Sequence, residues 1–382
     1  MLIDAIVHGE RACPFTVDLG NRASVSLIHV ANDPEGVYRL YIKKNDCCLE
    51  LCPSKGLSVR DTTLAGRSIF WEPPLEDLPD PRKIDLDGEM IYNGKIISGL
   101  NWIRYFAASI EMLGLIHWGM NKKDSEGKLL VLHGNASLIP IEKAIIQISE
   151  DIIEVKGEYY IYNANDIYKQ GIEKPIYKVN KSIQLLTSKN ALLLIDTITN
   201  ETSDALIPDW GYHIQLRPEP KCKLLFPKSD KKLRGGGQLP TDYNEWNPGD
   251  PAKRTEKGLI YKNIPITSTF PDGQPACEAL LEYENSTGTR CLYTPAPYTL
   301  GWYSCGGSES DEFLDLDGRR IFTKNWDGVG PEIGASDLDN NGEVSENIEV
   351  RELASGESMK LQIYVEPIDA VEVKGVKLRF EL

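Results

Sequence analysis

The sequence is dominated by short apolar runs in which hydrophobic and polar residues alternate with a period of two. Residues 145–148, 152–155, 183–186 and 361–365 are clear cases. Such alternation places successive side chains on opposite faces of a strand, so each run predicts a β-strand with one buried face. The 32 Gly and 23 Pro residues are spread between these runs. The pattern predicts an all-β fold, a large antiparallel β-sandwich with few short helices.

One segment departs from this pattern. Trp102, Phe106, Ile110 and Leu113 recur at helical spacing, which predicts a short helix lying across a sheet. The chain of 382 residues is long for one average domain, although all-β domains reach such sizes. Because no internal repeat, low-complexity tract or linker is visible, we expect a single β-sandwich domain over residues 1–382.

Three polar stretches interrupt the strand pattern, at residues 72–95, 227–258 and 303–347. Long loops on a rigid sheet scaffold usually build or cover a binding site. The middle stretch contains a basic run at residues 228–234, which is broken by Asp230 and followed by three glycines. This run is typical of a solvated loop.

The formal net charge of −15 opposes binding to nucleic acids and to anionic membranes. The first residues do not form a basic leader with an apolar core, and no apolar run approaches the length of about 20 residues that spans a bilayer. We therefore expect a soluble, cytoplasmic protein that is a monomer or a homodimer. Its eight cysteines are expected to be reduced thiols, because a chain of this size does not depend on disulfides for stability. No structural zinc is assigned, because a zinc site would need paired Cys-x-x-Cys or Cys/His knuckles.

Two of the five histidines lie in settings that suit chemistry. His133 follows an apolar strand and precedes Gly134, which would let a ligand approach closely; a structural histidine bonded to a carbonyl is an equal alternative. Strand alternation places Asp209, Gly211 and His213 on one side of the next candidate strand, so a polar row would line a cleft. Imidazoles are the commonest groups for proton transfer near neutral pH.

Several segments resemble a known family. The stretch Thr199-Asn200-Glu201-Thr202 followed by Tyr212-His213-Ile214-Gln215-Leu216 is similar to the segment of aldose 1-epimerases (galactose mutarotases) that carries their acid histidine. Leu132-His133-Gly134 resembles an upstream element of that family. Residues 53–56, 102–106, 114–119 and 297–302 are similar, in the same order, to a bacterial branch of uncharacterised aldose-1-epimerase-like proteins.

The resemblance implies a galactose mutarotase-like supersandwich and a cofactor-independent isomerase. Such an enzyme interconverts the α and β anomers of a free aldose or an aldose derivative, a small-molecule sugar. His213 would be the acid and His133 a second donor that orients the sugar. The base would be a glutamate in a C-terminal turn, for which Glu332 is our choice; Glu309 and Glu312, nearer to Trp302 in sequence, remain alternatives.

The resemblance also nominates substrate contacts. These candidates are Lys55, Arg104, His117, Asp209 and Gln215, with Trp302 stacking on a sugar face. For Arg104 and His117, buried structural hydrogen bonding is nearly as good an explanation. Lys55 stands where the branch usually has arginine, so substrate contacts are expected to differ from those of other relatives.

The acidic segment that starts at Asp337 resembles the first part of a calcium-binding EF-hand loop. Asp337, Asp339 and Asn341 stand at oxygen-ligand positions, and Gly342 stands at the turn. The twelfth position is Ile348, where a bidentate glutamate is required. A polar turn is therefore favoured, with calcium as the alternative, and no cofactor is expected to be required.

Two other functional classes remain open. A non-catalytic carbohydrate-binding protein would retain the sugar pocket without changing anomers. A polysaccharide lyase of similar sandwich architecture would abstract a proton beside a uronate carboxylate. The negative charge of the chain makes an acidic polymer a less natural substrate.

Overall fold

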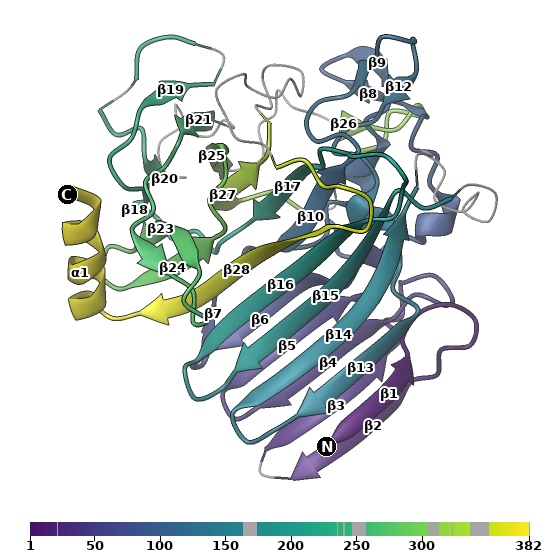
Figure 1. Ribbon diagram of the computed structural model, residues 1–382, viewed down its shortest axis with the longest axis horizontal. Coiled ribbons are helices and arrows are strands. Elements are labelled where there is room, and N and C mark those ends of the chain that lie inside the picture. The colour runs from purple at the N-terminus through teal and green to yellow at the C-terminus, as the bar shows by residue number, and fades with distance from the viewer. Residues whose placement is uncertain are drawn as a thin grey trace.

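Two large antiparallel sheets packed face to face form the body of the molecule, as the alternation predicts (Figure 1). The computed structural model describes residues 1–20, 22–162, 174–234, 236–239, 241–246, 257–304, 313–322, 324–336 and 351–381. Of the candidates from sequence, Glu309, Glu312, Asp337, Asp339 and Asn341 lie outside the described residues.

The first sheet has 11 strands and contains the long strands β14, β15 and β16, which face the viewer in Figure 1. Its strands in spatial order are β1 (Leu2–Ile6), β13 (Lys143–Ile148), β14 (Ile152–Ile161), β15 (Tyr177–Leu186), β16 (Ala191–Asn200), β28 (Ser358–Ile368), β24 (Gly288–Tyr293), β23 (Pro275–Glu282), β18 (Cys222–Leu225) and β20 (Glu245–Trp246), with β22 (Ser268–Thr269) beside β23.

The second sheet has 12 strands and carries the candidate site near its middle. Its strands in spatial order are β19 (Lys231–Leu233), β21 (Lys257–Lys262), β25 (Tyr298–Ser304), β27 (Gly328–Gly334), β17 (Asp209–Ile214), β10 (Ile110–Leu115), β6 (Ser58–Leu64), β5 (Cys47–Cys52), β4 (Arg39–Lys44), β3 (Ala23–Ile28) and β2 (Phe15–Gly20), with β7 (Arg67–Ser68) beside β6.

Small elements lie outside the two large sheets, and several of them group together at the upper right of Figure 1. They comprise the pair β11 (Lys122–Lys123) and β12 (Leu129–Leu130), the three-stranded sheet of β26 (Phe313–Leu314), β8 (Glu89–Tyr92) and β9 (Lys95–Ser98), and the 3-10 helices η1 (Pro53–Lys55), η2 (Pro81–Lys83), η3 (Asn101–Tyr105) and η4 (Ala136–Leu138). Helix α1 (Ala370–Glu381) follows β28 at the C-terminal end and packs on β23.

The core lies between the two sheets and follows from the period-two pattern. In β15, Val179 and Ile183 are buried while Asn180 is exposed. They join a continuous apolar cluster with Val25 and Leu27 of β3 in the other sheet. Strands β25 and β27 are buried along their whole length. Both faces of the second sheet are therefore covered where the candidate site lies.

The predicted helix over residues 102–113 is wrong. Residues 101–105 form the 3-10 helix η3, and residues 110–115 form strand β10. Every residue of β10 is buried, because the sheet is covered on both faces at this point. A fully buried strand shows no alternation, so its apolar residues can mimic helical spacing.

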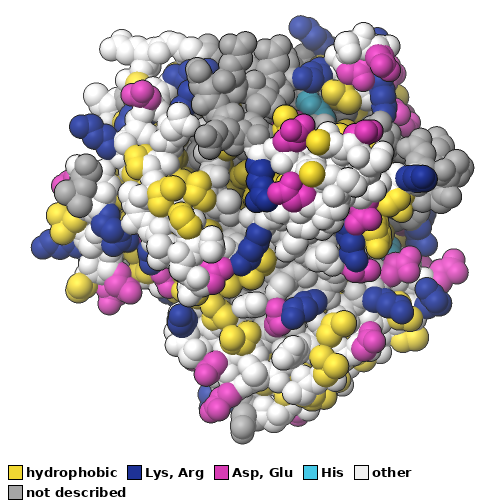
Figure 2. Space-filling model, viewed as in Figure 1, with side chains coloured by type: hydrophobic (Ala, Val, Ile, Leu, Met, Phe, Trp, Pro, Cys, Tyr) yellow, Lys and Arg dark blue, Asp and Glu magenta, His cyan; other side chains and the backbone are white. Residues whose placement is uncertain are grey.

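Charged side chains of both signs are mixed on the outer face of the first sheet (Figure 2). Lys156 pairs with Glu154, and Lys178 pairs with Glu158, each at 2.8 Å. Such exposed pairs stabilise a fold by less than about 1 kcal/mol each, so they contribute mainly to the polarity of this face. Within the described ranges, no helix is both long enough and apolar enough to cross a bilayer.

Candidate active site

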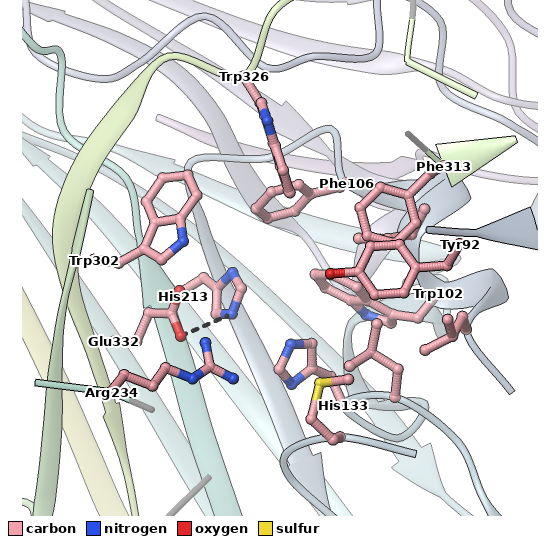
Figure 3. Close-up of a pocket in the computed structure, with 14 residues that line it drawn as sticks. Tyr92, Trp102, Phe106, His133, His213, Arg234, Trp302, Phe313, Trp326 and Glu332 are labelled. Carbon is pink, nitrogen blue, oxygen red and sulfur yellow. Dashed lines mark ion pairs between the residues drawn. The ribbon is translucent and has the colours of Figure 1, made fainter. Parts of the chain in front are cut away.

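A cavity of about 330 Å³ opens over strands β17 and β27 (Figure 3). Its volume lies at the lower end of the range for small-molecule sites. The described residues that line it are Tyr92, Leu100, Trp102, Ile103, Phe106, Met120, Leu132, His133, His213, Arg234, Trp302, Phe313, Trp326 and Glu332.

Strand pairing brings an imidazole and a carboxylate together at the floor of this pocket. Strands β17 and β27 are antiparallel neighbours, and their register sets His213 opposite Glu332. The distance from His213 Nε2 to Glu332 Oε2 is 3.4 Å (Figure 3). The two residues are only 5% and 4% exposed, respectively. An imidazole and a carboxylate that are 119 positions apart in the chain are therefore held side by side by a rigid sheet.

His133 reaches the same place from a turn that follows β12. Its backbone has φ of +56°, in the left-handed region that non-glycine residues seldom occupy. The centroid of its ring lies 4.9 Å from that of His213, and Trp102 packs edge-on against both rings. The buried Nδ1 atoms of His133 and His213 make no hydrogen bond within the described part of the chain. Buried polar atoms usually have partners, so both rings are suited to a polar ligand.

The Trp118 ring packs against the rings of His133 and His213. Its indole ring lies over Gly211 of β17 and Gly334 of β27, where an added Cβ would approach ring atoms to 1.9 and 2.6 Å. The Asp209 carboxylate accepts hydrogen bonds from the Trp118 backbone N–H at 2.9 Å and from the Ser336 hydroxyl at 2.6 Å. Burial raises the pKa of Asp209 to about 6. These contacts place the Trp118 ring beside both imidazoles.

A buried ion pair lies next to the same strands. Glu111 of β10 is in register with His213 on the side opposite Glu332. Its Oε2 lies 3.0 Å from Lys55 Nζ, and both side chains are almost fully buried. Burial raises the pKa of Glu111, while the Lys55 ammonium opposes this shift. The Lys55 ammonium also lies over the rings of Trp102 and Tyr105.

Both imidazoles are neutral in the free protein near pH 7. Burial lowers the pKa of His213 to about 3, with further lowering by the cations Arg234 and Lys55. Burial also lowers the pKa of His133 well below its usual value, and the neighbouring His213 adds to this effect. A neutral imidazole offers one N–H donor and one acceptor nitrogen.

The structure brings together four of the residues nominated from sequence: His133, His213, Trp302 and Glu332 all line the pocket. Lys55 is not part of the described lining and is paired with Glu111.

The remaining nominees lie outside the described lining. Asp209 supports Trp118 through the hydrogen bonds given above. Arg104 donates to Asn101 Oδ1 at 3.0 Å, and the His117 ring bonds the Met120 carbonyl at 2.8 Å. Gln215 is fully buried, and its backbone N–H donates to Ser109 O.

Sequence reasoning missed Arg234 and most of the aromatic lining. The signal was nevertheless present, because each of the three long polar stretches contributes to the pocket. Residues 72–95 contribute Tyr92, residues 227–258 contribute Arg234, and residues 303–347 contribute Phe313, Trp326 and Glu332. The stretch with the basic run was interpreted as solvated, and Arg234 at its end instead faces the cavity (Figure 3).

Comparison with known proteins supports the fold. A domain of unknown function, DUF4432, matches residues 34–218, which include His133 and His213 but end before Glu332. No curated protein gives a significant match to the sequence. The fold is that of the galactose mutarotase-like proteins, as the resemblance implied.

Three solved structures illustrate the likeness. A proposed aldose 1-epimerase from Klebsiella pneumoniae superposes with a TM-score of 0.75 at 15% identity, over 100% of this chain and 95% of that chain. A galactose mutarotase-like protein from Clostridium acetobutylicum superposes with a TM-score of 0.53 at 13% identity, over 91% of this chain and 99% of that chain. Galactose 1-epimerase from Lactobacillus acidophilus superposes with a TM-score of 0.51 at 11% identity, over 91% of this chain and 99% of that chain.

Proposed function

We propose that this protein is a mutarotase-like isomerase that exchanges the α and β anomers of a free aldose or a close derivative, without a cofactor. The observation that carries the proposal is the contact between His213 and Glu332, 3.4 Å apart inside a sugar-sized cavity. The shared fold with proteins described as aldose 1-epimerases supports it. Function does not follow from fold alone, so the chemistry of the pair has to support the proposal.

Anomer exchange requires one proton to leave the sugar and another to join it. Opening of the ring takes the proton from the anomeric hydroxyl O1 and adds one to the ring oxygen O5. Since O1 and O5 are both bonded to C1, the groups that serve them must be close neighbours. In the proposed mechanism the Glu332 carboxylate accepts the O1 proton while His213 donates to O5, and the C1–O5 bond breaks. Rotation about C1–C2 and reversal of these steps yield the other anomer.

The pair must hold one shared proton when the ring opens. It gives that proton to O5 and regains one from O1, so its proton count is unchanged. Because burial lowers the pKa of His213 to about 3, its protonated form is scarce but is a strong acid toward the weakly basic ring oxygen. His133, in contact with the His213 ring, would orient the sugar through a hydrogen bond from its neutral imidazole.

Substitution of the pair provides the test. His213→Asn and Glu332→Gln should each lower kcat/KM for anomerisation by about 10² to 10⁴, the usual contribution of a general acid or base. Polarimetry of freshly dissolved α-anomers from a panel of aldoses measures this rate. His29→Asn and Glu284→Gln are matched controls, because both residues are exposed and neither belongs to the described pocket lining, and they should retain the wild-type rate. A pocket variant as active as these controls would refute the assignment.

A non-catalytic sugar-binding protein is the second candidate. The neutral state of both imidazoles favours it, because neutral rings can hydrogen-bond a sugar without transferring protons. That protein would bind aldoses, and its addition would leave the rate of anomer exchange unchanged. The polarimetric measurement therefore separates the two candidates.

A further inference from the structure

The pocket has two chemically different ends. At the polar end, Glu332, His213, Arg234 and His133 converge from four separate segments (Figure 3). The other end is formed by aromatic rings, chiefly Tyr92, Phe313 and Trp326, drawn above and to the right of the polar group in Figure 3. Trp102 and Phe106 lie between the two ends, since both rings contact His213.

The aromatic end is a continuous set of packed rings. Tyr92 and Phe313 stack with ring centroids 4.4 Å apart and planes inclined by 14°. Trp326 meets Phe313 at 5.8 Å, Phe106 at 6.4 Å and Trp302 at 6.2 Å, each edge to face. The polar atoms of these five rings are the Tyr92 hydroxyl and the indole nitrogens. Among the described lining residues, no carboxylate, amide, ammonium or guanidinium belongs to this end.

This division determines which sugar fits. The proton-transferring groups lie at the polar end, so a sugar must place O1 and O5 there. Its more distant substituents then face the aromatic rings. A hydroxyl buried against rings gives up its hydrogen bonds to water without full replacement, whereas a methyl group gains apolar contact. In a hexose, C6 is the one carbon outside the ring, and loss of its hydroxyl produces a methyl group.

We propose that the preferred substrates are 6-deoxyhexoses, whose C6 methyl group packs among Tyr92, Phe313 and Trp326. The inference rests on the proposed function, because it uses the position of the proton-transferring pair to orient the sugar. An anionic sugar suits the pocket less well. Its one described cationic lining residue, Arg234, lies at the polar end together with the Glu332 carboxylate.

The experiment compares sugars that differ only at C6: D-fucose with D-galactose, 6-deoxy-D-glucose with D-glucose, and L-rhamnose with L-mannose. In at least one pair, kcat/KM for anomerisation should favour the deoxy sugar by about 10- to 100-fold, the range over which an apolar pocket discriminates against an added hydroxyl. Equal or better use of the parent hexose in all three pairs would overturn the inference. So would a preference for D-galacturonate over D-fucose.

A variant links the preference to the aromatic end. Phe313→Tyr adds a hydroxyl there and should reduce the deoxy preference several-fold. Phe322→Tyr is the matched control, because Phe322 packs against Phe313 and Trp326 but is not part of the lining. Phe322→Tyr should leave unchanged the ratio of kcat/KM for a deoxy sugar to kcat/KM for its parent hexose. Equal ratios in the two variants and the wild type would contradict the assignment of the C6 position to this end.

A measurement of sugar binding separates failure of this inference from failure of the proposed function. Titration of the same sugar pairs, followed by the fluorescence of the pocket tryptophans, measures affinity whether or not the protein is catalytic. If no aldose is anomerised but the deoxy sugars bind about 10-fold more tightly than their parents, the proposed function fails and the substrate class stands. If the members of each pair bind equally, or none of the deoxy sugars binds, the substrate class is wrong.

Discussion

At the scale of single residues, the proposed acid differs from an ordinary histidine because of its surroundings. The His213 ring is enclosed by Trp102, Phe106 and Trp118 and is nearly inaccessible to water. Removal of water from an imidazole disfavours its charged form. The His213 imidazole is therefore neutral near pH 7 in the free protein, unlike an exposed histidine, which is partly charged there.

This environment predicts an unusual pH profile. A group with a lowered pKa keeps its proton only at lower pH, so activity that needs the proton of His213 should fall as pH rises. In kcat/KM, which reports the free enzyme, this alkaline limb follows loss of the proton that the His213–Glu332 pair shares, and the lowered pKa of His213 should keep its midpoint below the ordinary histidine value of about 6.5. Initial rates of anomerisation measured from pH 4 to 9 provide the check. A midpoint of the alkaline limb at or above pH 6.5 would contradict the prediction.

At the scale of elements, the site depends on the packing of the Trp118 ring against β17 and β27. Gly211→Ala introduces a Cβ that would lie 1.9 Å from that ring. We expect a loss of roughly 1 to 3 kcal/mol in the free energy of unfolding, as for other overpacked sites. Because Trp118 packs beside His133 and His213, kcat/KM should also fall by about 10-fold or more.

The matched control is Gly375→Ala in α1, where an added Cβ meets nothing within 4 Å. Alanine is the better helix former, so this variant should be more stable by about 0.5 to 1 kcal/mol with unchanged activity. Urea denaturation and anomerisation rates measure both variants. Equal stability of the two would show that the Trp118 ring does not constrain Gly211.

The Lys55–Glu111 pair joins η1 to β10 within the covered part of the sheet. Lys55→Met leaves the Glu111 carboxylate buried without its cation and should cost roughly 3 to 5 kcal/mol in the free energy of unfolding. The double variant Lys55→Met with Glu111→Leu should regain most of that loss, because no charge is left buried. A double-mutant cycle measured in urea tests the coupling. A coupling energy below about 0.5 kcal/mol would contradict it.

The elements also explain where sequence reasoning succeeds and fails. Alternation located β13, β14 and β15, because each has one face in the core and one toward solvent. It also located β28, where Gln362 interrupts the apolar residues although residues 361–365 are all buried. It failed for β10, which is buried on both faces, and it did not anticipate α1. Arg234 was missed because a polar, glycine-flanked run looks the same whether it faces water or a cavity. In the structure, β19 pairs with β21, and the Arg234 backbone N–H donates to Gly258 O, which helps to position this residue.

At the scale of the whole molecule, three residues far apart in sequence meet because one sheet gathers their segments. His213 and Glu332 lie on adjacent strands, and His133 lies on a turn that brings its ring against that of His213. Short motifs in a consistent order nominated all three. The nature of the pocket's aromatic end required the three-dimensional arrangement, since pairing of β8 with β26 brings Tyr92 to Phe313 and no sequence motif nominated either residue.

The central claim is that the His213–Glu332 pair transfers protons on a sugar. Magnetisation exchange between the α and β anomeric protons, measured by NMR on aldoses at equilibrium, tests it most directly. We predict an exchange rate that rises in proportion to protein concentration and returns to the uncatalysed value in Glu332→Gln. An exchange rate that the wild-type protein leaves unchanged for every aldose tested, including the 6-deoxyhexoses, would contradict the account.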